Sequence, residues 1–373
     1  MAKQRTSIDR FYSIIPAGGI GSRLWPLSRA DAPKFLHDLA GSGSTLLRGT
    51  WDRLEPLAGA ERIMVVTGRA HRAAVEAQLP DLTDLNVVLE SEPRESSAAI
   101  GLAAAILERR EPGVIIGSFA ADHVISDQRG FRRAVVEAAA AADAGYIVAI
   151  GITPTEPAIG FGYIRTGDDL EIPGAPNALI ADAFVEKPDL ATATGYLSDG
   201  NYLWNGGMFI SRADVLLKQL GVAEPGLLAG LLELAEAWDT PARGAAVDRI
   251  WPALKKIAID YTVAEPAALA GKLVVIPGDF DWDDVGDFAA IAKLHTGGHK
   301  SDLAILGENA RVLADASTGV VISQTGRLIS LIGVTDIVVV DTPDALLVTT
   351  SANAQRVKAV VDALKLSGRT DVL

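Results

Sequence analysis

The chain has 373 residues and no cysteine, which excludes disulfides, thiolate metal sites and thiol catalysis. Its formal net charge of −13 at pH 7 argues against a broad nucleic-acid surface, because such a surface needs clustered cations. The polar opening MAKQRTSIDR predicts no secretory signal, and Glu137 and Asp143 make the longest alanine-rich stretch too polar to span a membrane. We therefore expect a cytoplasmic protein without nucleic-acid or membrane partners.

Short apolar runs alternate with helical segments through the first half of the chain. The predicted strands are Phe11–Ile15, Arg62–Val66, Asn86–Leu89, Gly113–Phe119 and Tyr146–Ile150. The predicted helices between them are Arg69–Gln78, Ser97–Arg109 and Gln128–Ala142. This alternation predicts an α/β fold with parallel strands and helices on both faces of the sheet. In such sheets the loops at the carboxyl ends of the strands bind ligands.

The second half changes character near the sequence HTGGHK (His295–Lys300), which predicts a domain boundary: 1–295 form one domain and 296–373 a smaller one. Before the boundary we predict four strands and two helices, Phe161–Arg165, Ala178–Val185, Trp204–Ile210, Ala213–Leu220 (helix), Leu227–Trp238 (helix) and Lys272–Ile276. After it, short β segments predict a small β domain resembling a short left-handed β-helix, at Ala304–Leu306, Gly319–Ser323, Leu328–Leu331, Asp336–Val340 and Ala345–Thr349. A C-terminal helix is predicted over Ala352–Leu366.

A glycine-rich loop, GGIGSR, follows the first predicted strand. It is not a P-loop, because the only Gly-Lys pair in the chain is followed by leucine, and it lacks the third glycine of the dinucleotide fingerprint. Its glycines would let the backbone approach a phosphate chain and turn N–H groups toward it. Arg23 and Lys34 would add charge-assisted bonds to phosphate oxygens. The alternative is a glycine turn followed by solvated surface cations.

Two aspartates are candidate ligands for a hard divalent cation. Asp122 comes just after the strand predicted to end at Phe119, and Asp284 lies in FDWDDVGDF before a helix predicted over Val285–Leu294. Carboxylate oxygens of this kind suit Mg²⁺. The alternatives are a turn residue for Asp122 and a helix N-cap for Asp284.

The string from Gly18 to Lys34 resembles the G-G-x-G-x-R-L-x-P-L-[ST]-x-x-x-P-K consensus of the sugar-1-phosphate nucleotidyltransferases. Trp25 and Ser28 within it look most like the mannose-1-phosphate guanylyltransferase branch. Further stretches resemble family motifs in the family's order: EPRESSAAIGLAAA, ADH, AIGFGYIRTG, FVEKP, YLWNGGMFI and FDWDDVGDF. The β-rich tail from Ile329 onward is also similar, so the resemblance covers nearly the whole chain.

The resemblance implies a Rossmann-like, GT-A-like mixed sheet with helices on both faces, followed by the small β domain and its terminal helix. It implies transfer of GMP from GTP to α-D-mannose 1-phosphate, with Mg²⁺ as cofactor, giving GDP-mannose and pyrophosphate. It also implies a homodimer, for which the apolar residues of the C-terminal helix are candidates, although core packing is their default role: Val357, Val360, Val361 and Leu364.

The site residues implied by the resemblance fall into four groups. The nucleotide-binding residues are Ala17, Gly18, Gly19, Gly21, Ser22, Arg23, Lys34, Ser96, Ser97 and Asp122. The sugar-phosphate-binding residues are Gly162, Glu186, Lys187 and Asn205, and the metal ligands are Asp122 and Asp284. The catalytic residues are Arg23, Lys34, Lys187, Asp122 and Asp284. For Ser96 and Ser97, helix capping is an equally good interpretation.

Two alternatives to this function stay open. One is another sugar-1-phosphate nucleotidyltransferase, acting on a glucose or heptose phosphate with a different nucleotide. The other is a non-catalytic paralogue that binds a nucleotide sugar and regulates a partner enzyme.

Overall fold

The computed structural model describes residues 7–299 and 301–373. Contacts within the chain define two compact units. The first contains residues up to 18 together with 50–121 and 125–282, and the second contains 19–49, 122–124 and 283–373. The domain boundary after residue 295 stays a prediction. Lys300 of the predicted linker and the first six residues of the polar opening segment lie outside the described residues.

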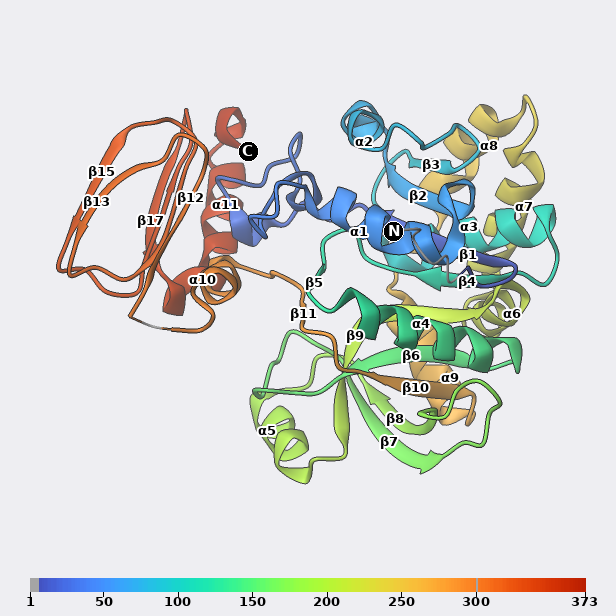
Figure 1. Cartoon of the computed structure of the whole chain (residues 1–373). Coiled ribbons are helices and arrows are strands. Elements are labelled where there is room, and N and C mark those ends of the chain that lie inside the picture. Colours follow the sequence, from blue (N-terminus) through green and yellow to red (C-terminus); the bar gives the residue numbers. More distant parts are fainter. Residues whose placement is uncertain (1–6, 300) are drawn as a thin grey trace, which may run out of the picture. The chain divides into compact units, whose positions relative to one another are not determined.

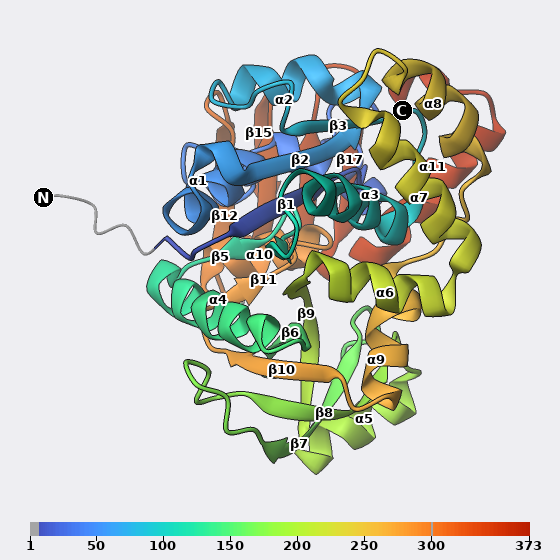
Figure 2. The ribbon, with the colours of Figure 1, turned by 90° about the vertical axis from the view of Figure 1, so that its right-hand side faces the viewer.

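The first unit is built on a nine-stranded mixed sheet with the order β3-β2-β1-β4-β9-β6-β10-β8-β7 (Figure 2). The strands β1, β2, β3 and β4 pair in parallel, as do β6 and β10, whereas β7, β8 and β9 make antiparallel pairings. Their bounds are β1 Phe11–Ala17, β2 Ile63–Gly68, β3 Val87–Glu90, β4 Ile115–Ser118, β6 Ile147–Ile152, β7 Tyr163–Asp169, β8 Leu179–Val185, β9 Tyr202–Arg212 and β10 Leu273–Gly278.

Helices cover both faces of this sheet, as predicted. The alternating side chains of β1 show this: Ile14 joins the core that contains the apolar side of α3, whereas Phe11 contacts Phe119, which in turn contacts Phe131 of α4. Figure 2 shows α3 over β1 and β2 and α4 beside β6. The helices are α2 Arg72–Gln78, α3 Glu95–Arg110, α4 Gln128–Asp143, α5 Leu190–Asp199, α6 Ala213–Ala223, α7 Pro225–Trp238, α8 Arg243–Ile250 and α9 Glu265–Leu269.

The second unit combines the C-terminal β domain with the loop that follows β1. Parallel strands alternate between two sheets, β12-β14-β16 with β17 at the edge and β13-β15, which is the arrangement of a β-helix (Figure 1). The bounds are β12 Leu303–Leu306, β13 Arg311–Asp315, β14 Gly319–Ser323, β15 Leu328–Ile332, β16 Ile337–Asp341, β17 Leu346–Thr350, α10 Phe288–Thr296 and α11 Val357–Leu366.

The larger of two apolar cores in the second unit joins the glycine-loop segment to the C-terminal helices. Leu24 and Trp25 from the glycine-loop segment share it with Phe288 of α10 and Val357 of α11. The indole N–H of Trp25 also donates to the main-chain oxygen of Val372, at 2.7 Å. The glycine-rich loop is therefore fixed by the packing of the C-terminal part of the chain. Val357, Val361 and Leu364 also pack into this core, so most of the apolar side of α11 packs within the second unit.

Three of the five passages of the chain from one unit to the other fall within helices or strands. These elements are α1 (Leu46–Ala58) and the short paired strands β5 (Val124–Ile125) and β11 (Trp282–Asp283). None of the helices in the described ranges is both long and apolar enough to cross a bilayer.

Candidate active site

The glycine-rich loop begins where β1 ends. Ala17 is the last residue of β1, Gly18 and Gly19 are exposed, and Ser22 starts the 3₁₀ helix η1 (Ser22–Leu24). At Gly21 the backbone has a φ of 73°, in the left-handed region that favours glycine. A Cβ placed there would lie 2.7 Å from Cβ of Lys34, so the loop approaches Lys34 too closely for any side chain. The path of the loop therefore depends on glycine at position 21.

Replacing Gly21 by alanine should lower the free energy of unfolding by about 1–3 kcal/mol, since the new Cβ meets both an unfavourable φ and the Lys34 side chain. Gly19→Ala is the matched control, because a Cβ at position 19 has no atom within 4 Å. The control should change the stability by no more than about 0.5 kcal/mol. Denaturant unfolding of both variants checks this, and equal losses would contradict the steric argument.

Lys34 connects the two candidate metal ligands of the second unit. Its side chain is buried, and the Nζ ammonium donates to Oδ2 of Asp122 at 2.8 Å and to the main-chain oxygen of Asp284. Three of the predicted catalytic residues are thus brought together from segments far apart in the chain. An ammonium has three N–H donors, and among the described residues only two acceptors are bonded to Lys34, so a third donor could serve a further acceptor such as a phosphate oxygen.

The two carboxylates differ in their electrostatic surroundings. Burial opposes ionisation of Asp122, but the Lys34 ammonium and His123 outweigh it and hold the pKa of Asp122 below its usual value. Burial raises the pKa of Asp284 to about 6; Lys34 opposes this rise, whereas nearby acidic side chains, including that of Asp122, add to it. The mutual repulsion of the two carboxylates is what a bound cation would relieve.

The N-cap of the helix that follows Asp284 is a different aspartate, Asp287. The helix α10 begins at Phe288 and not at Val285, and Oδ1 of Asp287 accepts from the N–H groups of Ala289 and Ala290. The N-cap interpretation of Asp284 is therefore wrong. Within the described residues the Asp284 carboxylate accepts no hydrogen bond, so it is available to a ligand.

Arg23 is exposed on η1 and makes no hydrogen bond or ion pair with any part of the chain that the structure describes. No acidic side chain of residues 7–299 or 301–373 forms an ion pair with this long cationic side chain next to the glycine loop. This is consistent with the predicted contact to phosphate.

The four predicted sugar-phosphate residues form a second cluster, in the first unit. A Cβ on Gly162 would lie 2.6 Å from Oε2 of Glu186 and 3.3 Å from Cβ of Asn205, so the backbone of Gly162 lies close against these two side chains. The Asn205 main-chain N–H donates to the Gly162 oxygen at 2.8 Å. Lys187 donates from Nζ to Oε1 of Glu186 while most of its side chain remains accessible.

Ser96 and Ser97, two of the predicted nucleotide-binding residues, have partners within the protein. Ser96 accepts a hydrogen bond from the Ile259 N–H at 2.9 Å, and the buried Ser97 hydroxyl pairs with that of Thr262 at 2.8 Å. Because α3 already begins at Glu95, neither serine is its N-cap, and the capping interpretation is wrong. Their contact with the base stays a prediction that no contact in the structure supports. Ser28, one of the two residues that resemble the guanylyltransferase branch, donates its hydroxyl hydrogen to the main-chain oxygen of Ile20.

Two buried acids that the sequence analysis did not select lie beside predicted site residues of the first unit. Glu90, the last residue of β3, has its pKa raised to about 7 by burial, and its Oε2 would be 3.4 Å from a Cβ on Gly18. Asp260 has its pKa raised to about 6 by burial and accepts from Asn205. A search for carboxylates at strand ends could have found Glu90. Nothing local in the sequence marks Asp260.

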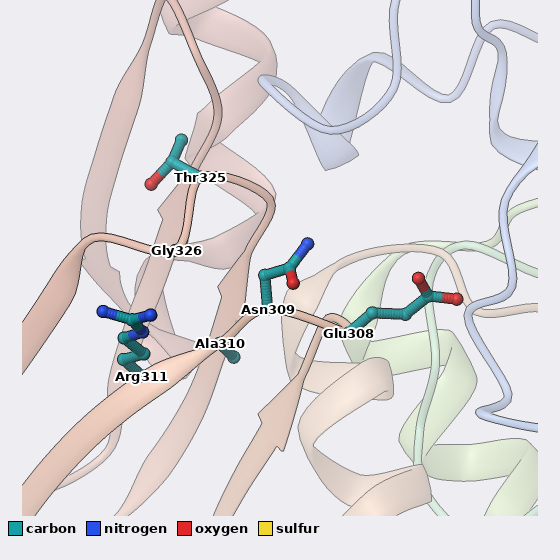
Figure 3. Close-up of a pocket in the computed structure, with 6 residues that line it drawn as sticks. All are labelled: Glu308, Asn309, Ala310, Arg311, Thr325 and Gly326. Atoms are coloured by element: carbon teal, nitrogen blue, oxygen red, sulfur yellow. The ribbon is translucent and has the colours of Figure 1, made fainter.

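A pocket of about 480 Å³ lies in the turns of the β-helix (Figure 3). It is lined by Glu308, Asn309, Ala310, Arg311, Thr325 and Gly326. None of the predicted site residues contributes to it, so this pocket has no part in the candidate site.

Most of the chain matches known protein families. Residues 12–301 match the family described as Nucleotidyl transferase. The chain belongs to the nucleotidyl transferase family. Residues 310–364 of this nucleotidyl transferase match the MannoseP isomerase/GMP-like beta-helix domain. The predicted family is confirmed, and so is the predicted α/β nucleotidyltransferase fold followed by a β-helix domain with a terminal helix. The left-handed sense of the β-helix stays a prediction.

Named relatives narrow the class of this nucleotidyl transferase. It is 38% identical over 375 residues to the mannose-1-phosphate guanylyltransferase ManC of Salmonella typhimurium, covering 96% of the chain and 74% of that relative. It is 37% identical over 375 residues to a mannose-1-phosphate guanylyltransferase of Escherichia coli K12, covering 97% and 75%. A solved structure described as mannose-1-phosphate geranyltransferase from Thermus thermophilus aligns with a TM-score of 0.82 at 31% identity, covering 95% and 99%. The chain is thus a mannose-1-phosphate guanylyltransferase-like enzyme.

Proposed function

We propose that this enzyme transfers GMP from GTP to α-D-mannose 1-phosphate and releases GDP-mannose and pyrophosphate. The observation that supports the proposal best is the arrangement of Lys34, which lies against Gly21 and donates to Asp122 and Asp284. An ammonium and two carboxylates beside a glycine loop suit a nucleoside triphosphate with a divalent cation. The names of the relatives supply the base and the sugar.

The residues present fit a magnesium ion. Asp122 and Asp284 offer only oxygen ligands, and the proximity of Asp122 contributes to the raised pKa of Asp284. No group of three or more His, Cys, Asp or Glu side chains suited to a metal occurs in the described ranges. Two carboxylates are nevertheless sufficient, because Mg²⁺ in such sites takes its other ligands from water and substrate phosphates. When bound, the ion would offset negative charge on the reacting phosphates.

The other residues have roles that follow from their chemistry. The backbone N–H groups from Gly18 to Gly21 and the free guanidinium of Arg23 would hold the β- and γ-phosphates that leave as pyrophosphate. Lys34 would direct its third N–H to the α- or β-phosphate, where negative charge increases in the transition state. This chemistry needs no protein nucleophile, because an oxygen of the sugar phosphate attacks the α-phosphorus in line.

The sugar phosphate would be bound by the cluster in the first unit. Lys187 is accessible and cationic, which suits the phosphate, while Glu186 and Asn205 offer an acceptor and an amide to the hexose hydroxyls. Glycine at position 162 lets the Glu186 and Asn205 side chains lie close to the backbone there. We further propose that the enzyme acts in the cytoplasm as a homodimer, as the family resemblance suggests.

A substrate panel tests this function. The purified full chain is incubated with Mg²⁺ and each pairing of GTP, ATP, UTP, CTP or dTTP with mannose, glucose or heptose 1-phosphate, and the nucleotide sugars are separated by chromatography. We expect GTP with mannose 1-phosphate to give the highest kcat/KM. Preference for another pair would replace this proposal with the alternative sugar-1-phosphate nucleotidyltransferase, and absence of product from every pair would contradict transferase function.

Removal of divalent metal should abolish turnover, because two anionic substrates and two carboxylates would otherwise repel one another. The measurement is pyrophosphate release after dialysis against EDTA, followed by titration with Mg²⁺. Activity should return with added Mg²⁺ but not with an equal ionic strength of NaCl. Full turnover in EDTA would rule out a metal role for Asp122 and Asp284.

A further inference from the structure

Asn205 is held by two hydrogen bonds of opposite kind. Its Nδ2 donates to Oδ1 of Asp260 at 2.8 Å, and its Oδ1 accepts from the main-chain N–H of Gly207 at 3.0 Å. If the amide were flipped, its oxygen would face the Asp260 carboxylate and its NH₂ would face the Gly207 N–H. Both of those contacts are repulsive, so the two partners together fix one orientation of the amide.

In this fixed orientation Asn205 can still form hydrogen bonds with a ligand. Among the described residues, one N–H of the amide and one lone pair of its oxygen have no partner, and the residue as a whole is 8% exposed. Gly162 and Glu186 lie directly beside it. A sugar hydroxyl that enters this cluster would therefore meet a donor whose direction is set in advance, which lowers the entropy cost of binding.

Asp260, the partner of the Asn205 amide, lies on a single turn of π-helix, η6 (Asp260–Ala264), in the same unit as Asn205. Burial raises its pKa to about 6, and the nearby Glu186 adds to that rise; Lys187 and the hydrogen bond from Asn205 act in the opposite direction. The Asn205 N–H is one of the groups that favour the ionised form of this carboxylate.

We propose that Asp260 is a positioning residue for the sugar phosphate: it acts through Asn205, by holding the amide in the orientation that binds a hexose hydroxyl. This inference rests on the proposed function of the cluster and adds a residue that the family resemblance did not assign. It makes Asp260 a determinant of the KM for the sugar phosphate and not of the affinity for the nucleotide.

A double-mutant cycle tests the inference. Asp260→Ala should raise the KM for the sugar 1-phosphate about tenfold, the effect of losing one hydrogen bond to a charged group, and leave the KM for GTP within about twofold. Asp260→Asn should recover most of the loss, because an amide oxygen still accepts from Asn205. In the background of Asn205→Ala, the Asp260→Ala substitution should have almost no further effect, since its only route of action is already removed.

The control variant is Asp168→Ala, an exposed aspartate of β7 in the same unit, which should behave as wild type. Thermal unfolding of each variant shows whether any loss reflects folding. If the effects of Asp260→Ala and Asn205→Ala multiply, Asp260 acts independently and the inference is overturned. The cycle is run with whichever sugar 1-phosphate the wild type prefers. If the proposed sugar is wrong, the substrate preference of the wild type reveals it, and the comparison between the variants still tests the role of Asp260.

Discussion

Asp284→Asn is expected to lower kcat/KM by at least about a hundredfold, the usual loss when one preorganised electrostatic group is removed from an active site. The asparagine keeps the size of the side chain but cannot supply the negative oxygen that a divalent cation prefers. Because the carboxylate has no hydrogen-bond partner in the described residues, the substitution should barely change folding. Steady-state kinetics at several Mg²⁺ concentrations measure the loss, and the variant should need more Mg²⁺ for half-maximal rate.

The neighbouring aspartate supplies a matched control for this variant. Asp283 lies one residue earlier and uses its Oδ1 to accept from the Val285 N–H at 2.6 Å, a bond that an asparagine oxygen can also accept. Asp283→Asn should therefore remain within about threefold of wild type. If Asp283→Asn were inactive and Asp284→Asn active, the metal ligand would be the other aspartate.

Lys34→Met should abolish most activity and also destabilise the second unit. Methionine keeps the apolar stem in its buried position but removes the ammonium that donates to Asp122 and to the Asp284 carbonyl. We expect at least about a hundredfold lower kcat/KM, since the charge proposed to stabilise the departing phosphates is lost. Breaking the pair should also lower the free energy of unfolding by about 1–3 kcal/mol. This is less than for a fully buried pair, because the Asp122 side chain is 32% exposed.

Lys255→Met is the control for Lys34→Met. Lys255 pairs with Glu224, but 56% of its side chain is exposed, so its removal should change the stability by less than about 1 kcal/mol and leave kinetics unchanged. Unfolding by denaturant and pyrophosphate release are measured on both variants. A Lys34→Met enzyme with normal turnover would exclude the proposed contact between Lys34 and phosphate.

The regular elements were predictable wherever hydrophobic periodicity was strong. The strand β1, predicted over Phe11–Ile15, continues to Ala17, and α4 and α6 lie within a few residues of their predicted bounds. The strand β13 (Arg311–Asp315) was missed because its apolar run is only three residues long, at 312–314, and its residues are mostly exposed. Helix α1 was missed as well; it contains Pro56, a residue that argues against a helix.

The site was predictable only in part, for a physical reason. The glycine loop and its cations are contiguous in sequence, whereas the contact of Lys34 with Asp122 joins positions 88 residues apart. Only the family resemblance indicated that such segments meet. Asp260 could not be predicted from the sequence for the same reason, because its proposed role depends on a hydrogen bond from Asn205, 55 residues away. Ser96 and Ser97 were selected by motif similarity alone, and their predicted role in nucleotide binding stays a prediction; in the structure they bond to Ile259 and Thr262.

A crystal structure of the full chain with a non-hydrolysable GTP analogue, Mg²⁺ and mannose 1-phosphate tests the central claim most directly. We expect the triphosphate to contact the backbone N–H groups from Gly18 to Gly21 and the Arg23 guanidinium, with the metal bound by Asp122 and Asp284. The sugar should contact Glu186 and Asn205. A triphosphate bound away from the glycine loop, or a metal that contacts neither aspartate, would contradict the account.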